Sequence, residues 1–375
     1  MDNIKAKYIS LGEKKDGYKK SQEEISQELK VASDYLNAIK QVFAKGETHP
    51  EQDIKILPTN VEPKAMSAQA ETHIDFNIDE KLELSEYYLA SAKTALNRFK
   101  AHSLIEQSGA ALMDRVDRKF LVPVSLLPDL FSALAPFYTV LSENNTKAFK
   151  YNTEYFDSKN DLLYLQHQNG LLNRHKIRIR EYVSSKQSFL EVKQKTNHFR
   201  TQKKRYLLAD KYKHVNINDL LVPLTDQEFP PLYKKLLVQY ERFTLKHKQQ
   251  AERITIDVNL TFSPINHIDS ERRNHSKTQQ LPEIAIIELK QEKQHKKTEF
   301  ENLIKQYKLR DMDFSKYCMG RILTLIDENL EQLPDQLKYN RFKSSLLMLK
   351  QIKQAFYSQH QNEITRESSN EYING

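Results

Sequence analysis

Apolar and polar residues alternate one by one along several short segments in the middle of the chain. In residues 174–182, Lys176, Arg178 and Arg180 are separated by isoleucines. Successive side chains of an extended strand point to opposite faces, so these cations share one face and the isoleucines share the other. Residues 189–195 repeat the pattern after a short turn. The two segments predict a hairpin with one basic face and one apolar face.

The same alternation predicts six further strands, at residues 115–122, 147–155, 202–208, 239–247, 252–262 and 283–290. Between and after them, apolar residues recur at intervals of three and four, which is the spacing of an amphipathic helix. These helical stretches are residues 21–44, 80–106, 125–138, 160–168, 220–238 and much of the chain from residue 298 onward. The pattern therefore predicts an α+β protein with eight strands.

Most of the predicted strands carry one charged and one apolar face, and this leaves two arrangements open. The charged face can be open to solvent, or the sheet can close into a barrel with the charges in its lumen. A closed barrel with apolar faces outward needs helices to cover it, and the chain supplies several. We therefore expect an eight-stranded antiparallel tunnel with a polar, basic lumen, covered by helices and preceded by a helical extension.

Changes in composition along the chain predict four regions. Residues 1–77 form a polar helical extension and linker, and residues 78–112 form a helical lead-in. Residues 113–325 form the tunnel domain. Residues 326–375 supply a C-terminal helix that packs on this domain, followed by a polar tail.

The charge balance favours an anionic partner. The formal net charge is +8 at pH 7 and the sequence pI is about 9.1. Nucleic acid, phosphorylated metabolites, polyphosphate and an anionic membrane surface all satisfy this balance. Only 7 glycines are present, and no glycine-rich phosphate loop or dinucleotide fingerprint is found. Nucleic acid is disfavoured, because cations that face into a tunnel cannot reach a duplex.

The chain has a single cysteine, Cys318, so no intramolecular disulfide can form. No secretory signal is visible at the N-terminus, and no apolar run approaches the roughly 18 residues needed to span a bilayer. We therefore expect a cytoplasmic protein without a membrane span.

The cations of the charged faces predict a phosphate-binding lumen. Arginine forks match phosphate oxygens in bidentate fashion and lysines act as point charges, so rows of both suit a linear triphosphate or polyphosphate. The expected phosphate- or substrate-binding residues on these strands are Lys119, Lys176, Arg178, Arg180, Lys193, Lys195, Lys203, Arg205, Arg242, Arg253 and Lys290.

Three acidic residues, Glu191, Asp257 and Glu288, lie on the same faces as the cations. Each can pair with a neighbouring Lys or Arg, or it can hold a divalent cation. Mg²⁺ or Mn²⁺ is usually held by one or two carboxylates together with phosphate oxygens and water. For Glu191 and Asp257 the residues themselves leave both roles open.

Seven segments resemble, in order, the VTC domain, which is the polyphosphate polymerase domain of the vacuolar transporter chaperone family, in its bacterial form. This family belongs to the triphosphate tunnel metalloenzyme, or CYTH-like, superfamily. The segments span roughly residues 110–325, and they are Met113–Phe120, Tyr155–Asp157 with Tyr164 and His167, Arg174–Tyr182, Phe189–Lys195, Arg253–Asp257, Ile287–Lys290 and Phe314–Gly320.

The resemblance implies an eight-stranded tunnel that binds ATP or another triphosphate with Mn²⁺ or Mg²⁺ and transfers the γ-phosphate to a growing inorganic polyphosphate chain. It implies catalytic roles for Lys119, Arg178, Arg180, Lys193 and Glu288, with Glu288 as the metal ligand, and it adds Lys316 to the phosphate-binding residues. No membrane helix or phosphate-sensing SPX pattern is found, so export of a polymer would need a membrane-protein partner. The alternatives are a triphosphatase, a nucleotide cyclase, or a non-catalytic module that binds polyphosphate or triphosphate.

Overall fold

The computed structural model describes residues 78–108, 115–197, 201–208, 216–221, 225, 228–265, 277–293, 295–326 and 337–374. All of them belong to one compact unit, Thr48–Gly375. The helix expected at residues 21–44 and the linker after it lie outside these residues, as do parts of the loops between strands.

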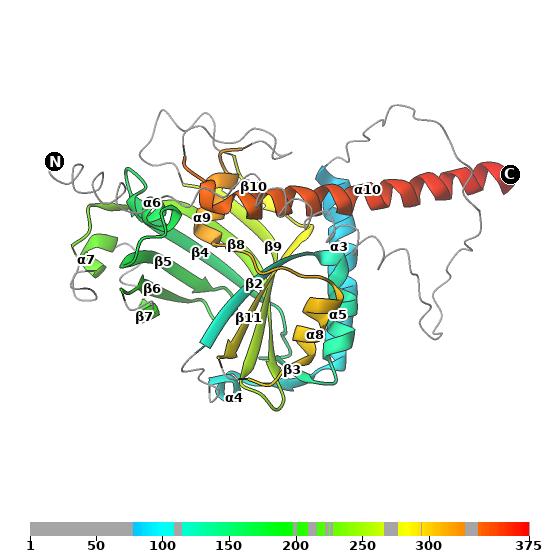
Figure 1. The fold of residues 1–375 in the computed structure, drawn as a ribbon, viewed down its shortest axis with the longest axis horizontal. Coiled ribbons are helices and arrows are strands. Elements are labelled where there is room, and N and C mark those ends of the chain that lie inside the picture. The colour runs from blue at the N-terminus through cyan, green and yellow to red at the C-terminus, as the bar shows by residue number, and fades with distance from the viewer. Residues whose placement is uncertain are drawn as a thin grey trace. The chain divides into compact units, whose positions relative to one another are not determined.

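The centre of the molecule is a large antiparallel sheet (Figure 1). Eight strands form one continuous ladder in the order β2-β11-β9-β8-β4-β5-β6-β7. They are β2 (Arg115–Pro123), β4 (Phe149–Ser158), β5 (Arg174–Tyr182), β6 (Gln187–Lys195), β7 (Thr201–Leu208), β8 (Leu232–His247), β9 (Glu252–Pro264) and β11 (Ile284–Glu292). The α+β class with an extensive antiparallel sheet is therefore as the alternation predicts.

Three short strands extend this ladder, and alternation did not predict them. They are β1 (Lys100–His102), β3 (Tyr138–Leu141) and β10 (Gln279–Leu281). β3 pairs with β8 and with β1, and β10 pairs with β9. Strands of three or four residues contain too few positions for a period of two to be recognised.

The ladder of described strands is open, so the closed barrel expected from the sequence is not confirmed. β2 and β7 are its two ends, and no pairing joins them among the described residues. The free edge of β2 is instead occupied by an irregular segment. The Lys119 amide donates to Asp311 Oδ1 at 2.9 Å, and the Met312 amide donates to the Lys119 carbonyl at 2.7 Å.

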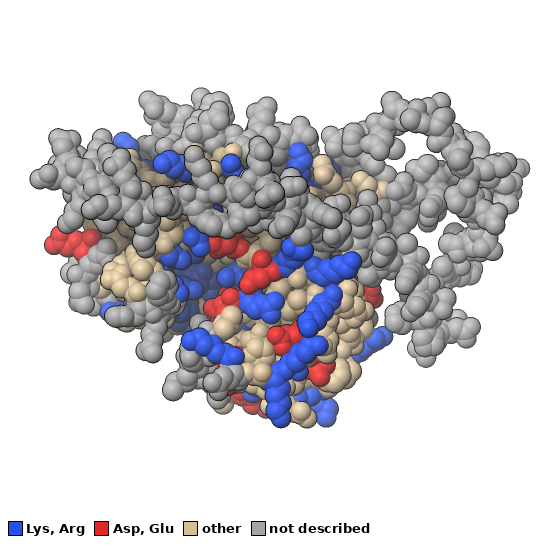
Figure 2. All heavy atoms as spheres, in the orientation of Figure 1, with Lys and Arg blue, Asp and Glu red and all other residues tan. Residues whose placement is uncertain are grey.

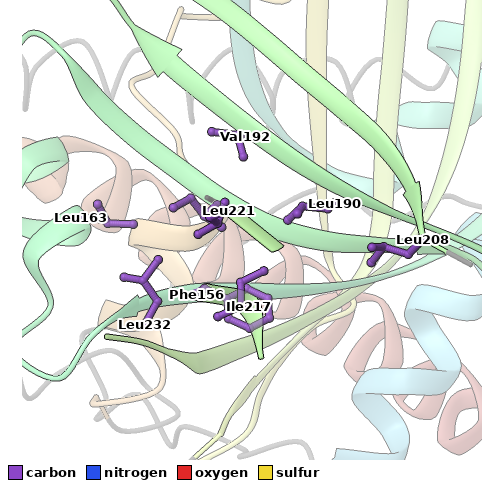
Figure 3. Packing of buried hydrophobic residues seen from close by; sticks show 9 residues of the cluster. Phe156, Leu163, Leu190, Val192, Leu208, Ile217, Leu221 and Leu232 are labelled. Atoms are coloured by element: carbon purple, nitrogen blue, oxygen red, sulfur yellow. The ribbon is translucent and has the colours of Figure 1, made fainter. Parts of the chain in front are cut away.

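One face of the β4–β7 region is apolar and forms a core of its own (Figure 3). Ile177, Leu190 and Val192 are at most 4% exposed. They pack with residues from α6 (Leu162–Gln168) and α7 (Ile217–Leu221). Burying these alternating residues fixes the register of the strands, because a slip of one residue would expose the whole apolar set. The basic residues between them must therefore face the other way.

Further helices pack on the rest of the sheet and on one another. α3 (Ile78–Ala95) contacts α5 (Leu127–Leu134), which contacts α8 (Glu299–Gln306). α10 (Lys343–Asn374) runs across β2 and β11. The remaining helical elements are α4 (Leu104–Ser108), α9 (Lys316–Leu323) and the 3₁₀ turns η1 (Leu96–Arg98), η2 (Val124–Leu126) and η4 (Asn340–Phe342).

The helix expected at residues 220–238 is wrong over most of its length. α7 ends at Leu221, and β8 begins at Leu232, directly after Pro230 and Pro231. Alternation was hidden here because the register of β8 against β4 shifts between Tyr155 and Phe156. A bulge of this kind places neighbouring residues on the same side and breaks a period of two.

Candidate anion-binding site

The second face of the sheet is concave and charged. Figure 2 shows Lys and Arg side chains gathered around a hollowed region between the strands β5–β7 and the strands β2 and β11. In a flat sheet the two ends of this ladder would lie far apart, because neighbouring strands are about 4.8 Å apart. Here the charges of β2 and β11 act directly on those of β5 and β6. The sheet therefore curls until its ends face one another.

Three lysines from different strands meet in this basin. Lys119 comes from β2, Lys176 from β5 and Lys193 from β6. Lys176 Nζ donates to Ser315 Oγ at 2.9 Å. Burial, together with the charges of Lys193, Lys119 and Arg178, lowers the pKa of Lys176 to about 7. Glu288 and Asp117 are the carboxylates that act on this cluster, and burial still keeps the pKa of Lys193 below its usual value. This crowding of like charges suits a site that is completed by an anion.

Glu191 is surrounded by cations on the same face. Its carboxylate lies 2.7 Å from Arg178 Nη2 and 2.7 Å from Lys203 Nζ. Arg180 and Arg205 follow at 3.8 and 3.7 Å. Burial raises the pKa of Glu191, but these cations outweigh it and hold the pKa well below its usual range. Glu191 therefore serves as an internal counter-ion that orients side chains from β5 and β7.

Asp257 on β9 has a similar role at the other side of the basin. Its two oxygens accept from Arg242 Nε at 2.5 Å and Nη2 at 2.7 Å, and Lys316 contacts it as well. Burial raises the pKa of Asp257, but Arg242 and Lys316 bring it down to about 2. Asp257 therefore ties β8 to the first turn of α9.

The side chain of Glu288 on β11 is 22% exposed, whereas those of Glu191 and Asp257 are 1% and 2% exposed. Glu288 forms an ion pair with Lys290, two residues further along the strand, and Lys119 is its cross-strand neighbour. Burial raises the pKa of Glu288, but Lys290 and Lys119 outweigh it and keep the pKa well below its usual range. Glu288 is therefore ionised at neutral pH, close to Lys119 and Lys193.

The carboxylates of this face differ in how well they fit a divalent cation. No cluster of three or more His, Cys, Asp or Glu residues that could hold a metal occurs in the described part of the chain. Glu191 and Asp257 do not fit, because both are buried and already paired with two or more cations. Glu288 fits a Mg²⁺ or Mn²⁺ ion that takes its remaining ligands from phosphate oxygens and water. Such an ion would neutralise charge on the bound phosphates.

The other sequence-predicted cations lie around this centre rather than within it. Lys195 is opposite Arg174 in the register of β5 and β6, towards the end that α9 covers. Arg253 is opposite Lys290 and so lies towards the other end of the basin. Arg242 is on the basic face, but its fork is engaged by Asp257. It therefore has less capacity for phosphate than the sequence suggested.

α9 covers one end of the concave face. Ser315 caps the helix by accepting from the Cys318 amide, which leaves Lys316 in the first turn, directed at Asp257. The approach to the sheet is close, since a Cβ at Gly320 would lie 2.5 Å from Leu236 and Phe262 side-chain atoms. Tyr317 reinforces the contact by donating to Asp157 at 2.5 Å.

Sequence reasoning missed several residues of the basin. Tyr155 Oη accepts from Arg178 Nη1 at 3.1 Å, and Tyr151 lies beneath Arg180 and Arg242. Ser315 is the partner of Lys176. The regular spacing of Tyr151 and Tyr155 on one face of β4 was visible in the sequence, but nothing in that spacing indicated which face would be concave.

The fold and the site together define a curled antiparallel sheet with one concave, basic face (Figure 2). A family model described as the VTC domain matches residues 114–325, which is more than half of the chain. The chain therefore belongs to the VTC domain family.

Solved structures show a more distant likeness. A candidate adenylyl cyclase from Hippeastrum, for which a dominant triphosphatase activity is recorded, is 15% identical, with a TM-score of 0.34 and coverage of 56% of this chain and 95% of its own. A candidate adenylate cyclase from Bacillus halodurans has the same identity and TM-score, with coverage of 54% and 96%. One from Vibrio parahaemolyticus is 11% identical, with a TM-score of 0.33 and coverage of 56% and 98%. These likenesses are too weak to assign a function.

No curated protein is detectably similar to this chain. Among the residues that the structure describes, no helix is long and apolar enough to cross a membrane.

Proposed function

We propose that this protein is a metal-dependent polyphosphate polymerase that transfers the γ-phosphate of ATP to a growing inorganic polyphosphate chain. The observation that carries the proposal is the meeting of Lys119, Lys176 and Lys193 with the ionised Glu288 in one basin. Membership of the VTC domain family supports the choice of a phosphate chain as the acceptor.

The chemistry of phosphoryl transfer suits this set of residues. The reaction needs alignment of the attacking and leaving oxygens and neutralisation of charge on the transferred group, rather than a covalent intermediate on the protein. Lys119, Lys176 and Lys193 supply point charges, and Arg178, which Glu191 and Tyr155 hold in place, adds its positive charge beside them. Glu288 is the residue that would hold the divalent cation, and the cation would supply positive charge that neutralises the phosphates.

The reaction is defined by what attacks the γ- or α-phosphate of the nucleotide. A phosphate chain as acceptor gives polyphosphate, water gives free phosphate, and the ribose hydroxyl gives a cyclic nucleotide. The basin favours the first, because its positive charge continues beyond Lys176 and Lys193 to Lys195 and to Arg174, which also donates to His167 and Leu171. That row can hold more phosphates than a single triphosphate requires.

The test is to incubate the purified chain with ATP and either Mn²⁺ or Mg²⁺ and to resolve polyphosphate, free phosphate and cyclic nucleotide. We expect polyphosphate to accumulate and to disappear in an Arg178→Ala variant. If free phosphate is the only product, the protein is a triphosphatase and the proposal is wrong. If cyclic nucleotide is the only product, the protein is a cyclase and the proposal is wrong. Absence of all three products would leave a binding module.

A further inference from the structure

An aromatic band continues the basic face away from α9. Tyr182 of β5 and Phe189 of β6 lie edge to face, with their ring centroids 5.6 Å apart. The Arg205 guanidinium of β7 lies over both rings, 3.6 Å from the centroid of Phe189 and 5.1 Å from that of Tyr182. Three neighbouring strands thus place two rings and one planar cation together.

This band is on the same face as the phosphate-binding candidates. Along β6, Phe189 is separated from Lys193 by Glu191, which points to the basin. The residues between them belong to the opposite, apolar core. At about 3.4 Å per residue the separation of Phe189 from Lys193 is about 13 Å. That distance is comparable to the span from the terminal phosphate of a nucleoside triphosphate to its base.

The band remains accessible although its members contact one another. Arg205 is 39% exposed as a side chain, and Leu207, the cross-strand neighbour of Phe189, is 60% exposed. One face of the guanidinium rests on Phe189, and the carboxylate of Glu191 lies 3.7 Å from Arg205 Nε. Packing and charge therefore hold the plane of Arg205 in place. An exposed apolar residue next to a fixed planar cation is a surface on which a base can stack.

We infer that Phe189, Arg205 and Leu207 form a platform for the base of a nucleoside triphosphate whose phosphates occupy the lysine cluster. Bases stack on aromatic rings and on arginine planes, and every base presents such a face. The platform accounts for how the site would distinguish a nucleotide from an inorganic phosphate chain. This inference rests on the proposed function, because it assumes that triphosphate binds in the basin.

The experiment compares ATP with inorganic tripolyphosphate, each titrated calorimetrically into the full chain in EDTA to prevent turnover. Arg205→Lys keeps the charge but removes the plane, and Phe189→Leu keeps an apolar side chain but removes the ring. Tyr206→Ala is the matched control, because Tyr206 lies on the opposite face of β7, beside Leu190.

We expect each platform variant to bind ATP about 5-fold more weakly or worse, the loss of one stacking contact, with less than about a twofold change for tripolyphosphate. Tyr206→Ala should change neither affinity. Titrating both ligands into one preparation removes the effect of partial misfolding, which would lower the binding-competent fraction for both.

Equal losses for the two ligands, or no loss for ATP, would overturn the platform while leaving triphosphate binding in place. Failure of the unsubstituted chain to bind either ligand would overturn the proposed function and the platform together.

Discussion

Three carboxylates on one basic face have three different environments, although the sequence presents them alike. Glu191 is only 1% exposed and has four cations around it, so its role is to orient them. Asp257 joins β8 to α9. Glu288 alone combines ionisation with room for phosphate and metal. Alternation predicted that all three share a face, but it could not show which cations from neighbouring strands would reach them.

Replacement of Glu288 by Gln tests its role as the metal ligand. The substitution keeps the size but removes the charge that a hard cation requires. Turnover of ATP should fall by about 100-fold or more, the loss typical when a group that stabilises transition-state charge is removed. Tripolyphosphate affinity, measured without metal, should persist or increase, because a negative charge has left a basic basin.

Glu154→Gln is the matched control for that experiment. Glu154 forms a partly exposed ion pair with Lys234, away from the basin. The Glu154→Gln variant should therefore turn over ATP at the same rate as the unsubstituted chain. Full metal-dependent turnover in Glu288→Gln would show that this residue does not hold the metal.

Lys176 should make stability depend on pH. Its pKa in the folded chain is about 7, below the usual value of 10.5, so the unfolded chain binds more protons between these values. The contribution of Lys176 to stability is therefore unfavourable at pH 6.5 and improves as pH rises through this window. Lys176→Met should raise the free energy of unfolding at pH 6.5 by about 1–3 kcal/mol, allowing for solvent screening.

Urea unfolding at pH 6.5 and pH 9.5 measures this effect. The gain in free energy of unfolding of Lys176→Met should be smaller at pH 9.5 than at pH 6.5. At pH 6.5 the variant should also bind tripolyphosphate more weakly than the unsubstituted chain. Lys150→Met is the control, since Lys150 is 68% exposed and remote from the basin. An advantage that stays the same at both pH values would contradict the lowered pKa.

At the scale of single elements, periodicity predicted well wherever one face of a strand is buried and the other is charged. β5, β6 and β9 fall within two residues of the predicted bounds for this reason. Prediction failed in the first half of β8, where a bulge breaks the period, whereas the predicted strand 239–247 coincides with its second half. It also ran past the end of α3, because the short elements η1, β1 and α4 follow it within the stretch that was predicted as one helix.

α9 is the element on which the site depends most. The motif around Phe314–Gly320 was visible in the sequence, but its position against β8 and β9 was not. Gly320→Ala adds a methyl group where Leu236 and Phe262 already lie at 2.5 Å. The helix must then move, and we expect a loss of about 1–3 kcal/mol in the free energy of unfolding.

Displacement of α9 should also weaken tripolyphosphate binding, because Ser315 and Lys316 would move away from Lys176 and Asp257. Chemical denaturation and calorimetric titration of the same variant measure both effects. Asn302→Ala, at an exposed position of α8, is the control. If Gly320→Ala kept both its stability and its affinity, α9 would not be packed as closely as described.

At the scale of the whole molecule, the decisive feature is the curling of the sheet. The strands and their basic faces could be predicted from sequence, because they follow from local alternation. The meeting of β2 and β11 with β5 and β6 could not, because it depends on twist summed over the whole ladder. The sequence predicted a barrel closed by hydrogen bonds between its first and last strands. The outer edge of β2 instead bonds to residues 311–312.

A chain that begins at Ile78 should retain the basin. Every residue placed in it lies between Lys119 and Lys316, and the family match covers residues 114–325. Such a chain should bind tripolyphosphate with an affinity within about twofold of that of the full chain, at the same ionic strength, since salt screens accessible charges. A folded truncation that has lost this affinity would assign residues 1–77 a part in binding.

The central claim is that the basin transfers the γ-phosphate of ATP to a phosphate chain. The most direct measurement supplies γ-labelled ATP, Mn²⁺ and an unlabelled polyphosphate primer, and then separates chains by length. Label should appear in chains longer than the primer, and this product should be absent with Glu288→Gln. Label found only in free phosphate, with the primer unchanged in length, would contradict the account.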